Sequence, residues 1–279
     1  MRHVSRSLLL TLLLTGCAAA EESEPDGSPV LAIESGVSVK GAGPSQQWEG
    51  IVMTMWRVNE REAEVCTATF ITERHLVTAA HCYPKSGPQK ISARAPTWNG
   101  NVWQPFDATV YRASTDLSAD IAVVDLGAPQ EWATPARRFK LFAGKVAPTD
   151  LHLYGYGGRT DASPDLDGTL RASPGYATVR ARDAGRGYIS ATAGVARACS
   201  GDSGGPALRE GTDAVVWGVF SAFSNSISRI LRDDDIVCPD AGSDLRYASV
   251  SANLAFVERS LGKPCTRLTV DGLPAAQCW

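Results

Sequence analysis

The sequence lacks a large excess of charge of either sign. Its 27 basic and 30 acidic side chains leave a formal net charge of −3, so no strong positive field is available to attract a nucleic acid or an anionic membrane surface. With 44% apolar and 20% charged residues, the chain also lacks the composition of disordered or collagen-like proteins. These absences leave a globular protein of one or two domains with no nucleic-acid partner.

The first apolar run, from Leu8 to Leu14, is far shorter than the ~20 residues that a membrane-spanning helix needs. Because basic residues precede it, the run is typical of a secretory signal. It ends in Leu-Thr-Gly-Cys, which resembles the bacterial lipobox. We interpret residues 1–16 as a signal peptide and Cys17 as the lipid-bearing first residue of the mature chain. Ordinary signal-peptidase cleavage after Ala20 is the alternative.

Residues 18–30 are rich in Glu, Ser, Pro and Gly, a composition typical of a disordered tether. We therefore expect residues 17–32 to form a tether or propeptide. The protein is expected to be exported, as a lipoprotein of the bacterial outer membrane or periplasm, or outside the cell after cleavage. Membrane contact is expected only through a lipid on Cys17.

Beyond Val30 the sequence consists of short β-prone runs separated by Gly, Pro, Asn and Asp clusters. The clearest runs are residues 50–58, 65–72, 120–126, 151–157 and 214–220. Short strands at this spacing predict an all-β barrel or sandwich. Helical spacing is convincing only after Val250, where Leu254, Val257 and Leu261 recur on one face, so a helix is predicted over about 250–262.

The segment Gly201-Asp202-Ser203-Gly204-Gly205-Pro206 places a serine between glycines. A tight turn there can expose the Ser203 hydroxyl and direct the N–H groups of Gly201 and Ser203 at one point, as hydrolysis by a serine requires. An α/β-hydrolase needs its histidine after the serine, but all four histidines precede Ser203. The subtilisin order needs an aspartate before the histidine, and the only one before His81 is Asp26 in the expected tether. The order His, Asp, Ser remains.

Three blocks in this order resemble the signature segments of trypsin-like serine proteases. They are Val77–Cys82, Asp120–Leu126 and Cys199–Pro206. The resemblance covers about residues 33–262. It implies an all-β fold of two six-stranded antiparallel β-barrels, about 33–130 and about 131–250, followed by the C-terminal helix.

The resemblance also implies roles for individual residues. His81 would be the general base and then the general acid, Asp120 would orient it, and Ser203 would be the nucleophile. The N–H groups of Gly201 and Ser203 would form the oxyanion hole. Ser221 matches the family serine that hydrogen-bonds the catalytic aspartate.

The seven cysteines of an exported chain indicate a disulfide framework, and the six that remain without Cys17 can pair completely. The resemblance implies two of the pairs, and the last two cysteines are expected to hold residues 263–279 as a tail. The expected pairs are Cys66 with Cys82, Cys199 with Cys238, and Cys265 with Cys278.

In this family a newly cut N-terminal amine enters the protein and pairs with the aspartate before the nucleophile, here Asp202. Ile33-Glu34-Ser35-Gly36 loosely resembles such an N-terminus. We therefore expect an activating protease to cut before Ile33, which would release the enzyme from its anchor at Cys17.

The sequence departs from trypsin at the specificity pocket. Arg197, six residues before the nucleophile, stands where trypsin has an aspartate; a cation there would repel Lys or Arg and accept Asp or Glu. Alternatively, Asp240 or Asp244 neutralises Arg197 and the pocket is shallow or blocked. Phe223 replaces a glycine that usually pairs with substrate, and Leu245 is a further expected pocket residue.

The sequence shows no metal motif, because His75 and His81 lack H-E-x-x-H spacing. We expect His75 in a loop or at a barrel edge, and no metal or cofactor. The sequence thus predicts an exported, monomeric serine endopeptidase that acts on protein or peptide substrates. The alternative is a non-catalytic binding protein that retains this fold.

Overall fold

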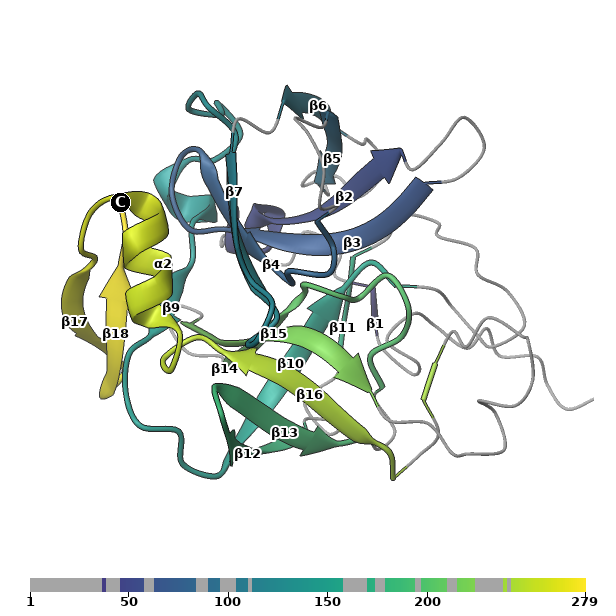
Figure 1. The fold of residues 1–279 in the computed structure, drawn as a ribbon, viewed down its shortest axis with the longest axis vertical. Helices are drawn as coiled ribbons and strands as arrows, with labels where there is room; N and C mark the ends of the chain where they lie inside the picture. The colour runs from purple at the N-terminus through teal and green to yellow at the C-terminus, as the bar shows by residue number, and fades with distance from the viewer. Residues whose placement is uncertain are drawn as a thin grey trace, which may run out of the picture.

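The strands of the chain form two sheets (Figure 1). The computed structural model describes residues 37–38, 46–57, 63–83, 90–95, 104–109, 112–157, 170–173, 179–193, 197–209, 215–223, 238–239 and 242–279. The expectations for Cys17 and Ile33 lie outside these residues.

The first sheet is antiparallel throughout and comes from the first half of the chain. It contains β2 (Ile51–Arg57), β3 (Ala63–Phe70), β4 (His75–Thr78), β5 (Lys90–Ala95), β6 (Gln104–Thr109), β7 (Arg112–Asp116) and β8 (Ile121–Asp125). Their spatial order is β6-β5-β2-β3-β4-β8-β7. All residues of β4 and the first four of β8 are buried. The apolar, mostly β-branched run of β8 fits this burial, whereas β4 also buries the polar side chains of His75 and Thr78.

The second sheet contains a closed barrel. Its strands are β1 (Val37–Ser38), β9 (Lys140–Phe142), β10 (Thr149–Gly155), β11 (Arg171–Ala172), β12 (Val179–Gly185), β13 (Tyr188–Thr192), β14 (Pro206–Arg209), β15 (Val215–Phe223), β16 (Asp244–Ser249), β17 (Thr266–Val270) and β18 (Leu273–Gln277). The ring runs β10-β12-β13-β16-β15-β14 and closes because β14 pairs with β10. All six pairings in it are antiparallel.

The expectation of a six-stranded barrel is therefore confirmed for the second half of the chain. In the first half, the described residues form a seven-stranded sheet, in which the terminal strands β6 and β7 do not pair with each other. Strand β1, although it opens the described chain, joins the second sheet by pairing with β11.

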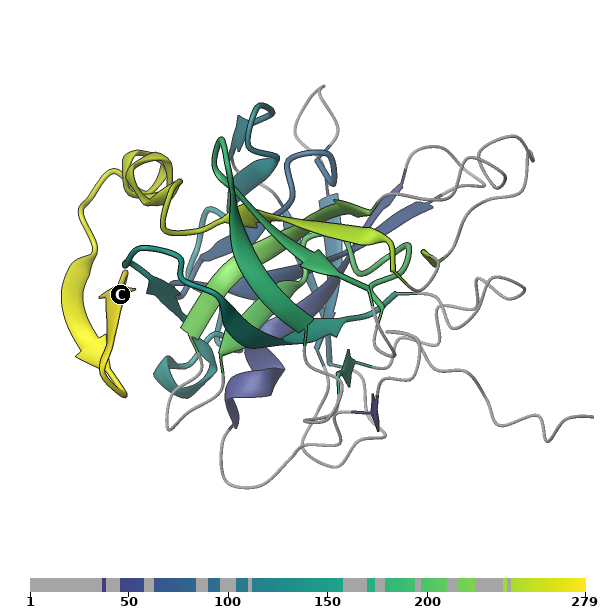
Figure 2. The same cartoon turned by 90° about the horizontal axis from the view of Figure 1, so that it is seen from below.

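The predicted C-terminal helix is α2 (Leu254–Leu261), which buries Leu254 and Val257. It ends at Gly262, whose left-handed φ of 70° is typical of a helix C-terminus. The β17–β18 hairpin follows, and β18 pairs with β9, which pairs in parallel with β15. Figures 1 and 2 show α2 and this hairpin together on one side of the molecule.

Two short 3-10 helices, η1 (Gln46–Gly50) and η2 (Pro135–Arg137), complete the described elements. Among these elements, none of the helices has the length and apolar character needed to cross a membrane.

One hydrophobic cluster joins the two sheets and the helix. It includes Ile51 and Ile121 from the first sheet, Leu141 and Val216 from the second, and Val257 from α2. Because such a core packs side chains against fixed neighbours, the loops that leave the two sheets are held in defined positions relative to each other. These loops carry the candidate site.

Candidate active site

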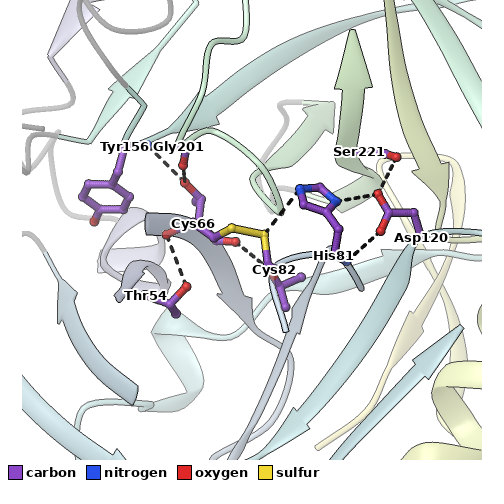
Figure 3. The surroundings of a disulfide bond; sticks show 10 residues. Thr54, Cys66, His81, Cys82, Asp120, Tyr156, Gly201 and Ser221 are labelled. Atoms are coloured by element: carbon purple, nitrogen blue, oxygen red, sulfur yellow. Dashed lines mark hydrogen bonds and ion pairs between the residues drawn. A yellow bond between two sulfur atoms is a disulfide. The ribbon is translucent and has the colours of Figure 1, made fainter. Parts of the chain in front are cut away.

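His81 lies in the turn after β4, with 45% of its side chain exposed. Its Nδ1 is 2.8 Å from Oδ2 of Asp120, and its backbone N–H donates to Oδ1 of the same carboxylate at 2.9 Å (Figure 3). A carboxylate accepts hydrogen bonds, so Nδ1 carries the proton in this pair and Nε2 is left with a free lone pair.

Asp120 immediately precedes β8 and has a left-handed φ of 51°, which aspartate tolerates better than most residues. Asp116 holds the preceding turn by accepting the N–H and the hydroxyl of Ser118 at 2.9 and 2.6 Å. Ser221 of β15 donates its hydroxyl to Oδ2 of Asp120 at 2.5 Å. Burial alone would raise the pKa of Asp120, but the hydrogen bonds from His81 and Ser221 bring this pKa below its ordinary value.

Backbone hydrogen bonds fold the segment around Ser203 into a tight loop before β14. The N–H of Asp202 donates to the carbonyl of Cys199 at 3.0 Å, and the N–H of Gly205 donates to the carbonyl of Asp202 at 2.8 Å. A Cβ at Gly204 would collide with side-chain and backbone atoms of the first sheet. The glycines around the serine thus allow the loop to pack against that sheet.

Two N–H groups of this loop, those of Gly201 and Ser203, have no acceptor within the described part of the chain. Gly201 has a φ of 93°, a conformation that glycine adopts without steric cost. Free backbone donors beside a serine hydroxyl can stabilise the negative charge that develops on a carbonyl oxygen during acyl transfer. They are the two groups that the trypsin-like motif predicts for an oxyanion hole.

The Asp202 side chain is 1% exposed and points away from solvent. Its carboxylate accepts the N–H of Gly157 and the N–H of Cys199, both at 2.7 Å. The partner expected for it, the amine of a cut chain at Ile33, lies outside the described residues, so that pairing stays a prediction.

The structure brings His81 and Asp120 together, but it does not join Ser203 to His81 by a hydrogen bond, as far as the described residues show. Nε2 of His81 instead lies 3.8 Å from Sγ of Cys82. Figure 3 shows the ring between the disulfide and the carboxylate. Hydrogen bonds of a catalytic site are often long without substrate and shorten when substrate binds.

The dipeptide Cys66-Thr67 in β3 connects the base and the serine. Cys66 forms a disulfide with Cys82, the residue after His81. Thr67 donates its backbone N–H to the carbonyl of Ser203 at 2.7 Å. Thr67 could not be predicted from the sequence, because no local motif marks a residue whose partners lie far along the chain.

The Arg197 guanidinium lies close to the Cys199–Cys238 disulfide. Its Nη1 donates to the backbone carbonyl of Pro239, the residue after Cys238, at 3.0 Å. Asp244 is one of the two residues expected to neutralise Arg197. Its Oδ1 lies 3.7 Å from Nη2 of Arg182. The other, Asp240, lies outside the described residues.

The two remaining pocket candidates differ in exposure. Leu245 of β16 is fully buried and packs in the core of the barrel. Phe223, at the end of β15, is partly buried and stacks on Phe220 with ring centroids 6.2 Å apart.

The three expected disulfides are all present. They join Cys66 to Cys82, Cys199 to Cys238, and Cys265 to Cys278. Cys66, Cys82 and the His81 ring also bring possible ligand atoms within 4.8 Å of one another. Because both sulfurs belong to a disulfide, they are not the thiolates that a zinc ion would need.

The expectation that His75 lies in a loop or at a barrel edge is wrong. His75 is in β4, between β3 and β8, and is 6% exposed. Its Nδ1 is 2.7 Å from the hydroxyl of Thr72. This local partner satisfies a polar ring within an apolar strand, which explains how the histidine can be buried.

Comparisons with known proteins agree with this geometry. A sequence profile of the trypsin family matches residues 43–230, which include His81, Asp120 and Ser203. Trypsin beta from Drosophila erecta is 26% identical over 183 residues, and trypsin delta and trypsin gamma from the same fly are each 27% identical over 184. Each alignment spans 57% of this chain and 71% of the relative. With this match over most of its length, the chain belongs to the trypsin family.

Proposed function

We propose that the protein is a serine endopeptidase that hydrolyses peptide bonds through an acyl-enzyme on Ser203. The observation that carries this proposal is the carboxylate of Asp120, which accepts hydrogen bonds from the ring and backbone of His81 and from Ser221. This arrangement leaves Nε2 of His81 able to take a proton from a serine hydroxyl. Membership of the trypsin family supports the same activity.

In the proposed reaction, Oγ of Ser203 attacks the substrate carbonyl carbon while Nε2 of His81 takes the hydroxyl proton. The charge that moves to the carbonyl oxygen would be stabilised by the N–H groups of Gly201 and Ser203. The C–N bond then breaks, and the imidazolium returns its proton to the leaving amine. A water molecule, deprotonated by Nε2, attacks the ester, and the tetrahedral adduct releases the acid and regenerates Ser203. Asp120 stays ionised and stabilises the imidazolium.

We further propose that the residue before the cleaved bond is Asp or Glu and not Lys or Arg. Arg197 supports this preference, because a cation at the floor of a partly desolvated pocket attracts a carboxylate and repels a base. A peptide library digested with the purified protein should show cleavage after acidic residues. Strong preference for basic residues would overturn the proposal, and digestion without any preference would favour a shallow or blocked pocket.

A second candidate function is a binding protein that retains the fold without turnover. The observation that favours it is the absence of a hydrogen bond between Ser203 and His81 within the described residues. The presence of the whole triad and of Gly201 argues for the enzyme.

The deciding experiment is intact-mass detection of a fluorophosphonate adduct on the protein purified from its native export route. The Ser203→Ala variant is the matched control. An adduct that disappears in the control supports the serine hydrolase, because formation of the adduct needs the nucleophile, the base and the oxyanion hole together. No adduct on a chain that begins at Ile33 would favour the binding protein.

We also propose export with removal of residues 1–16, a lipid on Cys17 and activation by a cut before Ile33. The lipobox-like sequence supports the lipid, and the position of Asp202 supports the cut. For the fold, we propose that the first sheet closes into a second barrel, and membership of the trypsin family supports this. The mass of the N-terminal peptide, compared with that of a Cys17→Ala variant, tests the lipid and the cleavage site together.

A further inference from the structure

The side chain of Thr67 lies between the two sheets and contacts the loop around Ser203, residues 199–205, here called the nucleophile loop. Thr67 is fully buried. Its hydroxyl donates to the carbonyl of Gly201 at 3.0 Å and accepts the N–H of Tyr156 at 3.1 Å. Its backbone N–H donates to the carbonyl of Ser203 at 2.7 Å, and its own carbonyl accepts the hydroxyl of Thr78 at 2.8 Å. Every polar atom of Thr67 is therefore used, and two of its four hydrogen bonds hold the loop.

The hydrogen bond to the carbonyl of Gly201 fixes a peptide group that would otherwise turn easily, because glycine has no Cβ to restrict its backbone. The peptide between Gly201 and Asp202 is held at both ends. The Thr67 hydroxyl binds its carbonyl oxygen at 3.0 Å, and its N–H donates to the carbonyl of Cys199 at 3.0 Å. Because the nitrogen of Gly201 is bonded to the same α carbon as this carbonyl, holding the peptide limits how far the neighbouring N–H of Gly201 can move.

We propose that the hydroxyl of Thr67 is a positioning group for the oxyanion hole, which holds Gly201 in the conformation that presents its free N–H to the reacting carbonyl oxygen. This inference rests on the proposed serine hydrolase function. An oxyanion donor acts mainly when charge develops on the oxygen. Loss of the hydroxyl should therefore slow acylation and leave substrate binding nearly unchanged.

A matched control is available on the same strand. Thr69 is two residues along β3 and fully buried, and its hydroxyl has no hydrogen-bond partner within the described residues. Thr69→Val thus removes a buried hydroxyl from β3 without touching the nucleophile loop. Thr67→Ser keeps the hydroxyl and removes only a methyl group. These two variants separate loss of the hydrogen bond from loss of packing.

The test uses the full chain, purified in the form that reacts with fluorophosphonate. The pre-steady-state burst with p-nitrophenyl acetate gives the acylation rate constant. Inhibition by phenylboronic acid reports the oxyanion hole, because the tetrahedral adduct places an oxygen there. We expect Thr67→Val to slow acylation about tenfold, less than the full loss of a donor, with little change in the substrate dissociation constant that the concentration dependence of the burst gives. Boronic acid inhibition should weaken by a similar factor.

Thr67→Ser and Thr69→Val should both stay within about twofold of the unsubstituted chain in the two measurements. Thermal unfolding identifies the temperature at which every variant is folded, and Thr67→Ala replaces Thr67→Val if the latter does not accumulate. An unchanged burst in Thr67→Val, or an equal loss in Thr67→Ser, overturns the inference. If the unsubstituted chain forms no fluorophosphonate adduct and releases no p-nitrophenol from the ester, the proposed function is overturned, and the inference with it.

Discussion

His75 is a buried imidazole that the proposed reaction does not use. The hydroxyl of Thr72 accepts the N–H groups of Arg74 and His75, so its own proton is free to donate to Nδ1 of His75. Nε2 then carries the ring proton and lies 3.6 Å from Oδ2 of Asp125. Burial lowers the pKa of His75 below its ordinary value, although the nearby charge of Asp125 raises it.

This lowered pKa makes the stability of the protein depend on pH. In the unfolded chain the histidine takes up a proton below about pH 6.5, while the folded state resists protonation. The contribution of His75 to the free energy of unfolding should therefore be constant above about pH 6.5. It should fall as the pH drops from there to the pKa of His75 in the folded protein. Urea unfolding at several pH values, with His75→Gln as control, measures this contribution. An equal pH dependence in the control would contradict it.

Local chemistry explains which site residues could be predicted from the sequence. A serine between glycines, and a histidine and an aspartate next to apolar runs, are patterns of neighbouring residues, so they predicted His81, Asp120 and Ser203 as candidates. The bond from Thr67 to Gly201 joins residues 134 positions apart. No short segment contains that information, because it arises only when the two sheets pack.

At the scale of elements, one disulfide closes the C-terminal hairpin. Cys265 and Cys278 are both buried and bridge the two ends of the β17–β18 hairpin. Glu258 of α2 accepts the N–H of Cys265 at 2.9 Å and pairs with Arg267 at 2.6 Å. The disulfide thus joins Cys278, which follows β18, to Cys265, whose N–H is bound by Glu258 of the helix.

Replacement of both Cys265 and Cys278 by alanine should lower the free energy of unfolding by about 3 kcal/mol, the value for closing a loop of about 15 residues. Activity of the folded variant should be retained, because the hairpin pairs with β9 and not with the loops of the candidate site. Urea unfolding followed by tryptophan fluorescence measures the change. A loss below about 0.5 kcal/mol would contradict this account.

Element predictions were best where a strand is a continuous run of apolar residues. The runs 120–126, 151–157 and 214–220 correspond to β8, β10 and β15. The β17–β18 hairpin was not predicted, because its buried residues, Val270, Ala275 and Ala276, do not alternate with exposed ones as in a half-buried strand. The parallel pairing of β9 with β15 depends on tertiary packing and leaves no local pattern.

At the scale of the whole molecule, a tyrosine ties the second sheet to the first. Tyr156, after β10, donates its hydroxyl to the carbonyl of Ile51 in β2 at 2.8 Å. Burial, and then the charge of Glu49, raises the pKa of Tyr156 well above its ordinary value, so the hydroxyl keeps its proton as a donor.

Tyr156→Phe should lower the free energy of unfolding by about 1–2 kcal/mol, because the carbonyl of Ile51 loses a buried partner. Tyr247→Phe is the control, since the Tyr247 hydroxyl is buried with no hydrogen-bond partner in the described part of the chain. Its removal should be neutral or stabilising. Because one core joins the two sheets, unfolding should remain a single transition by fluorescence and circular dichroism. Separate transitions would show that the halves unfold independently.

The pairing of β18 with β9 has a further consequence for the behaviour of the protein in solution. A strand with unpaired N–H and carbonyl groups is a template for pairing with another chain, and so a site of aggregation. Strand β9 is already paired on one side with β15, and the terminal hairpin covers the other. Shortening the chain after Gly262 would uncover this second side, with Leu141 and Phe142 buried beside it. The β17–β18 hairpin thus keeps the backbone of β9 from pairing with a second chain.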